Sequence, residues 1–181
     1  EDEHYSLEHL IPEVVEVARS YAGRKNIPVI AAGGIATGED IARFMTLGAS
    51  AVQMGSIFVP TEECDASVEF KKVYLNAHRE DIRIIQSPVG MPGRAFDGEF
   101  IRNVAEGKEK PRSCPFHCIK TCDYTKSPYC IIKALYNAAT GNMKKGYAFA
   151  GGNAYLSDKI RSVREVVEKL KTDFFLSKVA F

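Results

Sequence analysis

The chain has 181 residues, of which 45% are hydrophobic, enough to bury one sizeable core. Its 24 Lys and Arg residues nearly balance its 23 Asp and Glu residues, which excludes the strong positive field that attracts nucleic acid or an anionic membrane surface. No apolar run approaches the roughly 20 residues of a membrane helix, and five Cys without a sign of secretion predict reduced thiols in the cytoplasm rather than a disulfide framework.

The first predicted elements are a helix and a strand. Apolar residues recur with helical spacing, and a proline suits an early helical turn, so we expect a helix from about Pro12 to Ala22. Its expected buried stripe is Leu10, Val14, Val17, Ala18 and Tyr21. The continuous apolar run at 27–32 stops at Gly33-Gly34, which predicts a strand buried on both faces, as in a parallel sheet.

A second helix and a second strand follow. Thr37 can cap a helix whose third position is Asp40, and Gly48 ends that helix. Its expected buried residues are Ile41, Phe44 and Met45. Another buried strand at 51–54 closes on Gly55-Ser56. Helices and strands that alternate with linkers of a few residues require a parallel sheet, so the expected fold class is α/β.

The regular alternation ends after the next helix, which has Phe70, Val73, Tyr74 and Ala77 on one face. We expect one more strand at 82–85 and irregular chain from Ser87 to Gly93. The remaining helical stretches are about Gly98–Glu106, Tyr129–Ala139 and Ser157–Phe175. The expected organisation is β/α units over residues 1–80, an irregular and helical excursion over 81–156, and a carboxyl-terminal helix over 157–181 that packs on these units.

Both predicted strands end in a turn that contains glycine, one at Gly33-Gly34 and the other at Gly55-Ser56. If the strands are neighbours in a parallel sheet, the N–H groups of the turns converge at its carboxyl edge, where backbone donors and a helix N-terminus can hold a phosphate. Glycine permits this because a Cβ would block the oxyanion, and Ser56 adds a hydroxyl donor. The simpler interpretation is that these glycines only form tight turns.

Four stretches together resemble the nitronate monooxygenase (2-nitropropane dioxygenase) family: IPVIAAGGI, LGASAVQMGSIFVPTEEC, SPVGMPGRAF and GNMKKGYAFAGGNAY. The resemblance spans about Leu7 to Ser157 and extends to the flavin-dependent enoyl-acyl-carrier-protein reductases. It implies the last part of an FMN-dependent (β/α)8 TIM-type barrel, followed by a helical carboxyl-terminal extension. It also implies that the FMN phosphate is held by Gly33, Gly34, Gly55 and Ser56, with Met54 beside them.

The family pattern also contains parts that this sequence lacks. Its early strands carry contacts to the flavin ring, and a Gly-Gly-His turn carries the catalytic base; both precede the helix at Pro12. Neither His4 nor His9 lies in such a turn, so we expect the catalytic His before residue 1. We therefore expect a fragment that is inactive alone, that the missing amino-terminal half of the barrel completes, and that can form a homo-oligomer.

The activity implied by the resemblance is oxidation of a small-molecule substrate, an alkyl nitronate, by dioxygen through FMN. Reduction of an enoyl thioester by NAD(P)H on the same fold and phosphate site is the alternative enzyme activity. The alternative of another class is a non-catalytic module that binds a metal or a phosphate.

Two further residues are candidates for the substrate side. Asn153, in the AGGNAY stretch, occupies the place where members of the family often carry a polar amide near the substrate, and the neighbouring glycines allow a close backbone approach. Arg94 follows Met91-Pro92-Gly93 and can face the substrate. The alternatives are a plain loop at Asn153 and a solvated or ion-paired arginine at Arg94.

A cluster of cysteines stands outside the family motifs, and it comprises Cys114, Cys118, Cys122 and Cys130. Such soft ligands can hold zinc or an iron–sulfur cluster. Their spacing matches neither the paired zinc knuckles nor the ferredoxin run, and on a helix the first three would line one face. We therefore expect no metal and interpret the four, like the isolated Cys64, as small buried residues in a reducing compartment.

Overall fold

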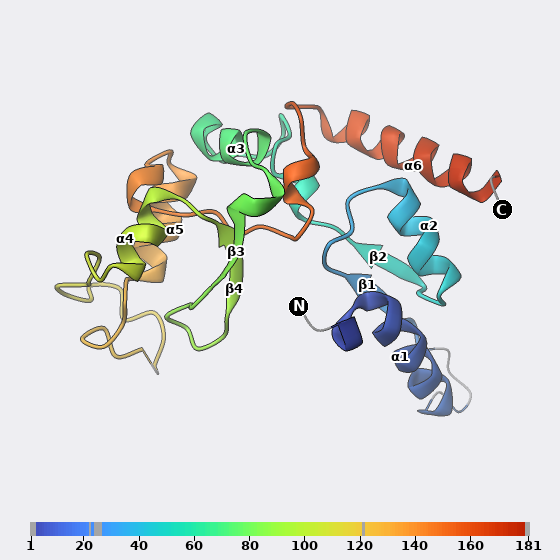
Figure 1. Cartoon of the computed structure of the whole chain (residues 1–181), viewed down its shortest axis with the longest axis horizontal. Coiled ribbons are helices and arrows are strands. Elements are labelled where there is room, and N and C mark those ends of the chain that lie inside the picture. The colour runs from blue at the N-terminus through green and yellow to red at the C-terminus, as the bar shows by residue number, and fades with distance from the viewer. Residues whose placement is uncertain (1–2, 22, 24–26, 121, 180–181) are drawn as a thin grey trace. The chain divides into compact units, whose positions relative to one another are not determined.

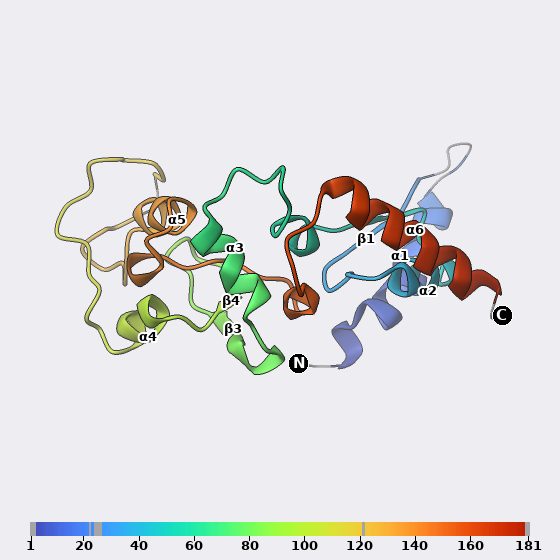
Figure 2. The same ribbon diagram turned by 90° about the horizontal axis from the view of Figure 1, so that it is seen from above.

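The computed structural model describes residues 3–21, 23, 27–120 and 122–179 of the chain. These residues form two compact units, the first comprising Glu1–Phe58 and Arg161–Phe181 and the second Val59–Ile160. Figures 1 and 2 show the elements of each unit from two directions. Because the arrangement of the units relative to each other is not determined, each is described by itself.

The first unit is built on a pair of parallel strands, as the sequence predicts. Its elements in chain order are η1 (Glu3–Tyr5), α1 (Leu7–Tyr21), β1 (Ile30–Ala32), α2 (Gly38–Thr46), β2 (Ala51–Gln53), η2 (Ser56–Phe58) and α6 (Val163–Val179). β1 and β2 pair in parallel, with Ile30 opposite Ala51 and Ala32 opposite Gln53. α2 connects them, and the core between strands and helices contains Ile11, Val15, Ala31, Ile35, Phe44 and Ala49.

The second helix, α2, begins where the sequence places it. The Thr37 hydroxyl accepts a hydrogen bond from the Asp40 N–H at 3.1 Å, and the Asp40 carboxylate accepts one from the Thr37 N–H at 3.1 Å. This reciprocal capping box confirms the predicted start of the helix. Within α2, Phe44 is buried as expected and Ala42 is buried beside it, but Met45 is exposed, so the expected stripe was wrong at that position.

The prediction for the first helix was wrong in its start and in its buried face. α1 starts at Leu7, so Pro12 lies inside the helix rather than in its first turn, and Ala22 lies outside the described residues. The buried residues are Ile11 and Val15, whereas three of the five residues expected to be buried are exposed, namely Val14, Val17 and Tyr21. Apolar residues occupy so much of the helix surface that more than one stripe satisfies the helical period.

The strands are buried on one face only, which corrects the expectation of burial on both faces. Ala31 is fully buried, whereas Ile30 is 57% exposed and Ala32 is exposed. The β2 residues opposite them, Ala51 and Gln53, are also exposed. α1 and α2 pack on the buried face, while the alternating side chains of the other face contact solvent.

The second unit combines an antiparallel hairpin with helices. Its principal elements are α3 (Val68–Leu75), η3 (Arg79–Asp81), β3 (Ile82–Ile85), β4 (Gly93–Phe96), α4 (Glu99–Ala105), α5 (Ile131–Ala139), η4 (Met143–Lys145) and η5 (Ala154–Leu156). β3 confirms the predicted strand at 82–85. β4, which the sequence did not indicate, pairs antiparallel with β3, from Ile82 opposite Phe96 to Ile85 opposite Gly93.

The later helices lie close to their predicted ranges: α4 and α5 are slightly shorter, while α6 starts later and ends later than predicted. α6 starts at Val163 rather than near Ser157 because Ser162 caps it: the Ser162 hydroxyl accepts from the Glu165 N–H at 3.2 Å, and the Glu165 carboxylate accepts from the Ser162 N–H at 2.7 Å. α6 packs against α2 in the first unit, while α3 belongs to the second. Along the chain, the second compact unit begins at Val59.

The second unit has an aromatic core. Phe100 stacks on Tyr147 with ring centroids 6.1 Å apart, and Tyr129 meets both rings edge-on. The Tyr129 hydroxyl donates to the Tyr147 hydroxyl at 3.1 Å, which satisfies two polar groups inside this core. In the described part of the chain, no helix combines the length and apolarity of a membrane span.

Candidate functional site

The two glycine turns follow the same edge of the parallel pair. Ala32 and Gln53, the last residues of β1 and β2, lie opposite each other in the register. Gly33 comes directly after Ala32, and Gly55 comes two residues after Gln53. Because both strands run in the same direction, both turns leave the sheet at its carboxyl edge. The sequence argument placed the turns at neighbouring strand ends, and the register brings them there.

The main chain of these turns is open to a ligand. Gly33 has a φ of 107° and Gly34 a φ of 69°, a left-handed conformation that side chains with a Cβ rarely adopt. A Cβ placed on Gly33, Gly34 or Gly55 would meet no heavy atom within 4 Å, so no described side chain fills the space beside these residues. A ligand atom can therefore approach this backbone closely.

The N-terminus of α2 contributes less than the sequence argument assumed. The Asp40 carboxylate accepts from the Ala36 and Thr37 N–H groups at 3.0 and 3.1 Å, so these donors are already used. The same carboxylate pairs with Arg43 at 2.8 Å, which partly offsets its charge. The other residues predicted to hold the phosphate, the glycines and Ser56, lie at this edge of the sheet, and Ser56 is the first residue of η2.

Met54 lies between the second strand and its glycine. Its side chain is half-buried and packs against the hydrophobic core of the first unit. Met54 therefore packs in the core directly before Gly55 and Ser56.

The two candidates for the substrate side lie together in the second unit. Arg94 is on β4, and its carbonyl accepts from the Ala150 N–H at 2.9 Å, which aligns the segment before Asn153 with the strand. A Cβ on Gly152 would lie 3.6 Å from the Arg94 guanidinium, an ordinary contact distance, so this loop passes beside that side chain. Arg94 and Asn153 are both half-buried, and two separate sequence motifs thus meet at one place.

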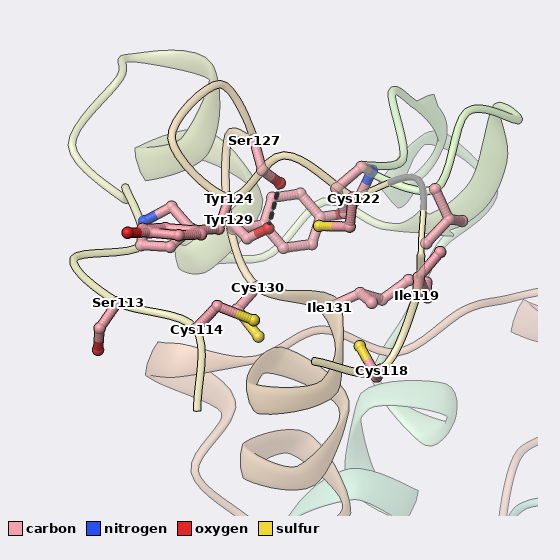
Figure 3. Close-up of a pocket in the computed structure, with 13 residues that line it drawn as sticks. Ser113, Cys114, Cys118, Ile119, Cys122, Tyr124, Ser127, Tyr129, Cys130 and Ile131 are labelled. Carbon is pink, nitrogen blue, oxygen red and sulfur yellow. Dashed lines mark hydrogen bonds between the residues drawn. The ribbon is translucent and has the colours of Figure 1, made fainter. Parts of the chain in front are cut away.

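The cysteine cluster also lies in the second unit, where its four members line one pocket (Figure 3). The expectation that they are buried was wrong, because Cys118 and Cys122 are exposed and Cys114 and Cys130 are half-buried. The segment that carries them is not helical either. All four are free thiols, and among the described residues no three donors converge on the position of a single metal ion.

The cysteines are nevertheless close enough to affect one another. The pKa of the Cys122 thiol is raised above its ordinary value by desolvation and then by the charges of Cys114, Cys118 and Cys130. A negative charge on one sulfur therefore disfavours a second, as expected for thiols gathered around one space.

Sequence reasoning missed one buried charged residue, Lys71 in α3. Its side chain is 7% exposed, and its ammonium group donates to the Thr61 carbonyl at 2.7 Å. The bond ties the VPTEEC stretch to the helix. One feature of the sequence could have indicated that Lys71 is buried. It lies three residues before Tyr74, so the two side chains share the helix face that packs into the core.

Comparison with known proteins gives matches over nearly the whole chain. A sequence model of the family described as nitronate monooxygenase matches residues 1–173. A protein described as a probable nitronate monooxygenase from Staphylococcus aureus strain Newman is 26% identical over 160 residues, which are 88% of this chain and 43% of that protein.

Two solved structures have a similar fold. FabK from Thermotoga maritima superposes with a TM-score of 0.73 at 29% sequence identity, covering 97% of this chain and 50% of that chain. Nitroalkane oxidase from Streptomyces ansochromogenes superposes with a TM-score of 0.70 at 24% identity, covering 97% and 45%. The chain thus spans about half the length, or less, of these relatives.

Proposed function

Because the chain belongs to the nitronate monooxygenase family, we propose that it is the carboxyl-terminal part of an FMN-dependent oxidoreductase that oxidises alkyl nitronates with dioxygen. The observation that carries the proposal is the shared carboxyl edge of β1 and β2, where two glycine turns present open main chain. Paired phosphate-binding loops at this edge are frequent in parallel barrels, and a flavin mononucleotide carries a phosphate.

The residues at this edge fit a phosphate group chemically. A phosphate needs hydrogen-bond donors that can approach its oxygens from several sides, and backbone N–H groups beside glycines meet this need. In the proposed complex, the main chain at Gly33, Gly34 and Gly55 donates to the phosphate, and the Ser56 hydroxyl adds a donor. Met54 supports the second turn from the core.

The remaining roles are divided between this chain and other residues. When bound, FMN supplies the acceptor for the electrons that leave the nitronate carbon and passes them to dioxygen. We assign Arg94 and Asn153 to the substrate side, where the positive guanidinium suits a negatively charged nitronate. The Gly-Gly-His turn of the family has no counterpart in this sequence, so we assign the catalytic base to residues outside this chain.

Substitution of Gly55 by Ala tests the phosphate site. Unlike Gly33 and Gly34, Gly55 has no left-handed φ, and a Cβ there meets open space, so the fold accommodates alanine. The added methyl group occupies the space needed by the phosphate, and the loss of one or two hydrogen bonds should weaken FMN binding roughly tenfold to a hundredfold. Titration of the full-length apoprotein with FMN, followed by flavin fluorescence, measures the change.

Gly98→Ala is the matched control for this experiment. Gly98 also has open space for a Cβ and a φ of −91°, but it lies in the second unit at the N-cap of α4. The FMN affinity of the Gly98→Ala variant should equal that of the unaltered protein. If Gly55→Ala binds FMN as tightly as Gly98→Ala does, the assignment of the phosphate to this turn is wrong.

A second candidate function is reduction of an enoyl thioester by NAD(P)H through FMN. The likeness to FabK favours it, since it supports the resemblance to flavin-dependent enoyl-acyl-carrier-protein reductases. Anaerobic mixing of the full-length flavoprotein with NADH or with an alkyl nitronate separates the two activities. Bleaching of the flavin absorbance by the nitronate alone supports the monooxygenase, whereas rapid bleaching by NADH supports the reductase.

A further inference from the structure

The segment between α4 and α5, residues 106–130, is unusually long for chain without regular structure. Apart from Thr121, which is not described, it contains turns and bends but neither a helix nor a strand. Loops longer than about 12–15 residues are uncommon in compact domains and are usually either functional or disordered linker segments. Four of the five cysteines of the chain lie in this segment.

The exposure of these cysteines does not fit a role in packing. Free cysteine is among the most buried residue types and behaves as a small apolar side chain. Here Cys118 and Cys122 are exposed, yet both line the same pocket as Cys114 and Cys130 (Figure 3). Burial of apolar surface therefore does not explain why four thiols share one space.

Local hydrogen bonds return the chain to this pocket after Cys122. The Asp123 carboxylate accepts from the Thr125 N–H at 3.1 Å and from the Thr125 hydroxyl at 2.6 Å, and the Asp123 carbonyl accepts from the Ser127 N–H at 3.0 Å. This turn lies in the longest interval between two of the cysteines, from Cys122 to Cys130, and Cys130 is the N-cap of α5. The four thiols thus reach one pocket although their spacing matches no familiar signature.

We propose that Cys114, Cys118, Cys122 and Cys130 form a tetrathiolate site for a soft metal centre, either zinc or an iron–sulfur cluster. Both metals take thiolate ligands from four cysteines. A metal bound by all four cysteines would join distant parts of the irregular segment. Residues 106–130 contain five basic and three acidic side chains, and this small positive excess partly balances four thiolates.

No three described donors converge on one ion, although all four cysteines line the pocket. Metal analysis therefore has to decide between zinc and an iron–sulfur cluster.

Alkylation of the full-length protein tests the site without any substitution. The protein is purified anaerobically and treated with iodoacetamide in the presence of a phosphine reductant, so that disulfides cannot protect thiols. Mass spectrometry then measures the extent of alkylation of each cysteine. We expect Cys118 and Cys122 to be protected despite their exposure, and to become modified after a chelator removes the metal. The same measurement is made on protein supplied with zinc and on protein supplied with ferrous iron and sulfide. If Cys118 and Cys122 are fully modified before chelation in both samples, the proposal is overturned.

Metal analysis of variants distinguishes the two kinds of centre. Samples are loaded with zinc alone or with ferrous iron plus sulfide, and bound zinc, iron and acid-labile sulfide are measured. Cys122→Ser should lose the bound metal, whereas Cys64→Ser, which lies outside the pocket, should retain it. Circular dichroism verifies that both variants fold. Metal content that is equal in the two variants contradicts the site. Because no flavin is measured, this result is independent of the proposed oxidoreductase activity.

Discussion

At the scale of single residues, the second unit depends on buried tyrosine hydroxyls. Tyr74 is 3% exposed and donates to the Phe149 carbonyl at 2.6 Å, while Tyr129 and Tyr147 bond to each other. Desolvation by burial is the main cause that raises the pKa of all three phenols above the ordinary value of 10. The three phenols are neutral in the folded state, and they resist ionisation more than they do in the unfolded chain.

This difference predicts a loss of stability in alkali. A phenol with a raised folded-state pKa keeps its proton while the unfolded chain releases it, so stability is constant near neutral pH and falls as the pH rises through about 10. Tyr147→Phe removes one such group, and its free energy of unfolding should fall less steeply above that pH. At neutral pH the variant should be less stable by about 1 kcal/mol, because the Tyr129 hydroxyl loses its acceptor.

Urea unfolding of the full-length protein at several pH values measures both effects. Tyr136→Phe is the control, since Tyr136 is 68% exposed and its hydroxyl contacts solvent. An alkaline decline in Tyr147→Phe that is as steep as in the control would show that the buried phenol is not responsible.

The residues of the candidate sites differ in how well the sequence predicted them. The places of the glycine turns were predictable because an apolar strand followed by glycine indicates a turn, as at Gly33. The exposure of Cys118 and Cys122 was not, because it depends on how an irregular segment folds back, which no periodicity records. The contact between Arg94 and Gly152 was also hidden, since it arises from pairing between distant segments.

At the scale of elements, the close packing of α2 on α6 depends on one glycine. A Cβ on Gly38, the first residue of α2, would overlap the α6 backbone at Phe174 and Leu170. Backbone atoms cannot move aside as a flexible side chain does, so Gly38→Ala must separate the two helices. We expect this variant to lose roughly 1–3 kcal/mol of stability.

Hydrogen exchange locates the effect of Gly38→Ala. Exchange should become faster in α6, over Val163–Val179, and remain unchanged in the aromatic core of the second unit. Gly98→Ala again serves as a control, because the space beside that residue is open. Unaltered protection of α6 in Gly38→Ala would mean that the two helices pack less closely than the structure indicates.

The elements themselves were predictable where local chemistry defines an end. The capping box of Thr37 and Asp40 fixed the start of α2 from a few neighbouring residues. The buried face of α1 was not predictable, since its apolar residues allow several stripes and only packing in the core of the first unit selects Ile11 and Val15. β4 was missed because Pro92 and Gly93 indicate a turn, while the strand that follows is defined by its pairing with β3.

At the scale of the whole molecule, the main feature is an exposed sheet face. Ile30 and Ala32 on β1 and Ala51 on β2 are exposed, although strands of parallel sheets are normally covered on both faces. The same strands carry helices on their other face, as the outer side of a barrel does. The chain spans about half of FabK, which has a similar fold. We expect the exposed face to be the inner side of a barrel in a protein of that length.

This expectation is testable at Ile30. In the isolated 181-residue chain, Ile30→Ser should change the free energy of unfolding by no more than roughly 0.5 kcal/mol, because the side chain is 57% exposed. In a protein of the relatives' full length, the same substitution should cost roughly 1–3 kcal/mol, since isoleucine would then be buried in the barrel interior. Phe44→Ala should cost about 3–5 kcal/mol in both, because Phe44 is buried within the first unit itself. Denaturant unfolding followed by circular dichroism measures the effect of each substitution on the free energy of unfolding of each protein. If Ile30→Ser has an equally small effect in both proteins, this face stays exposed and no barrel closes around it.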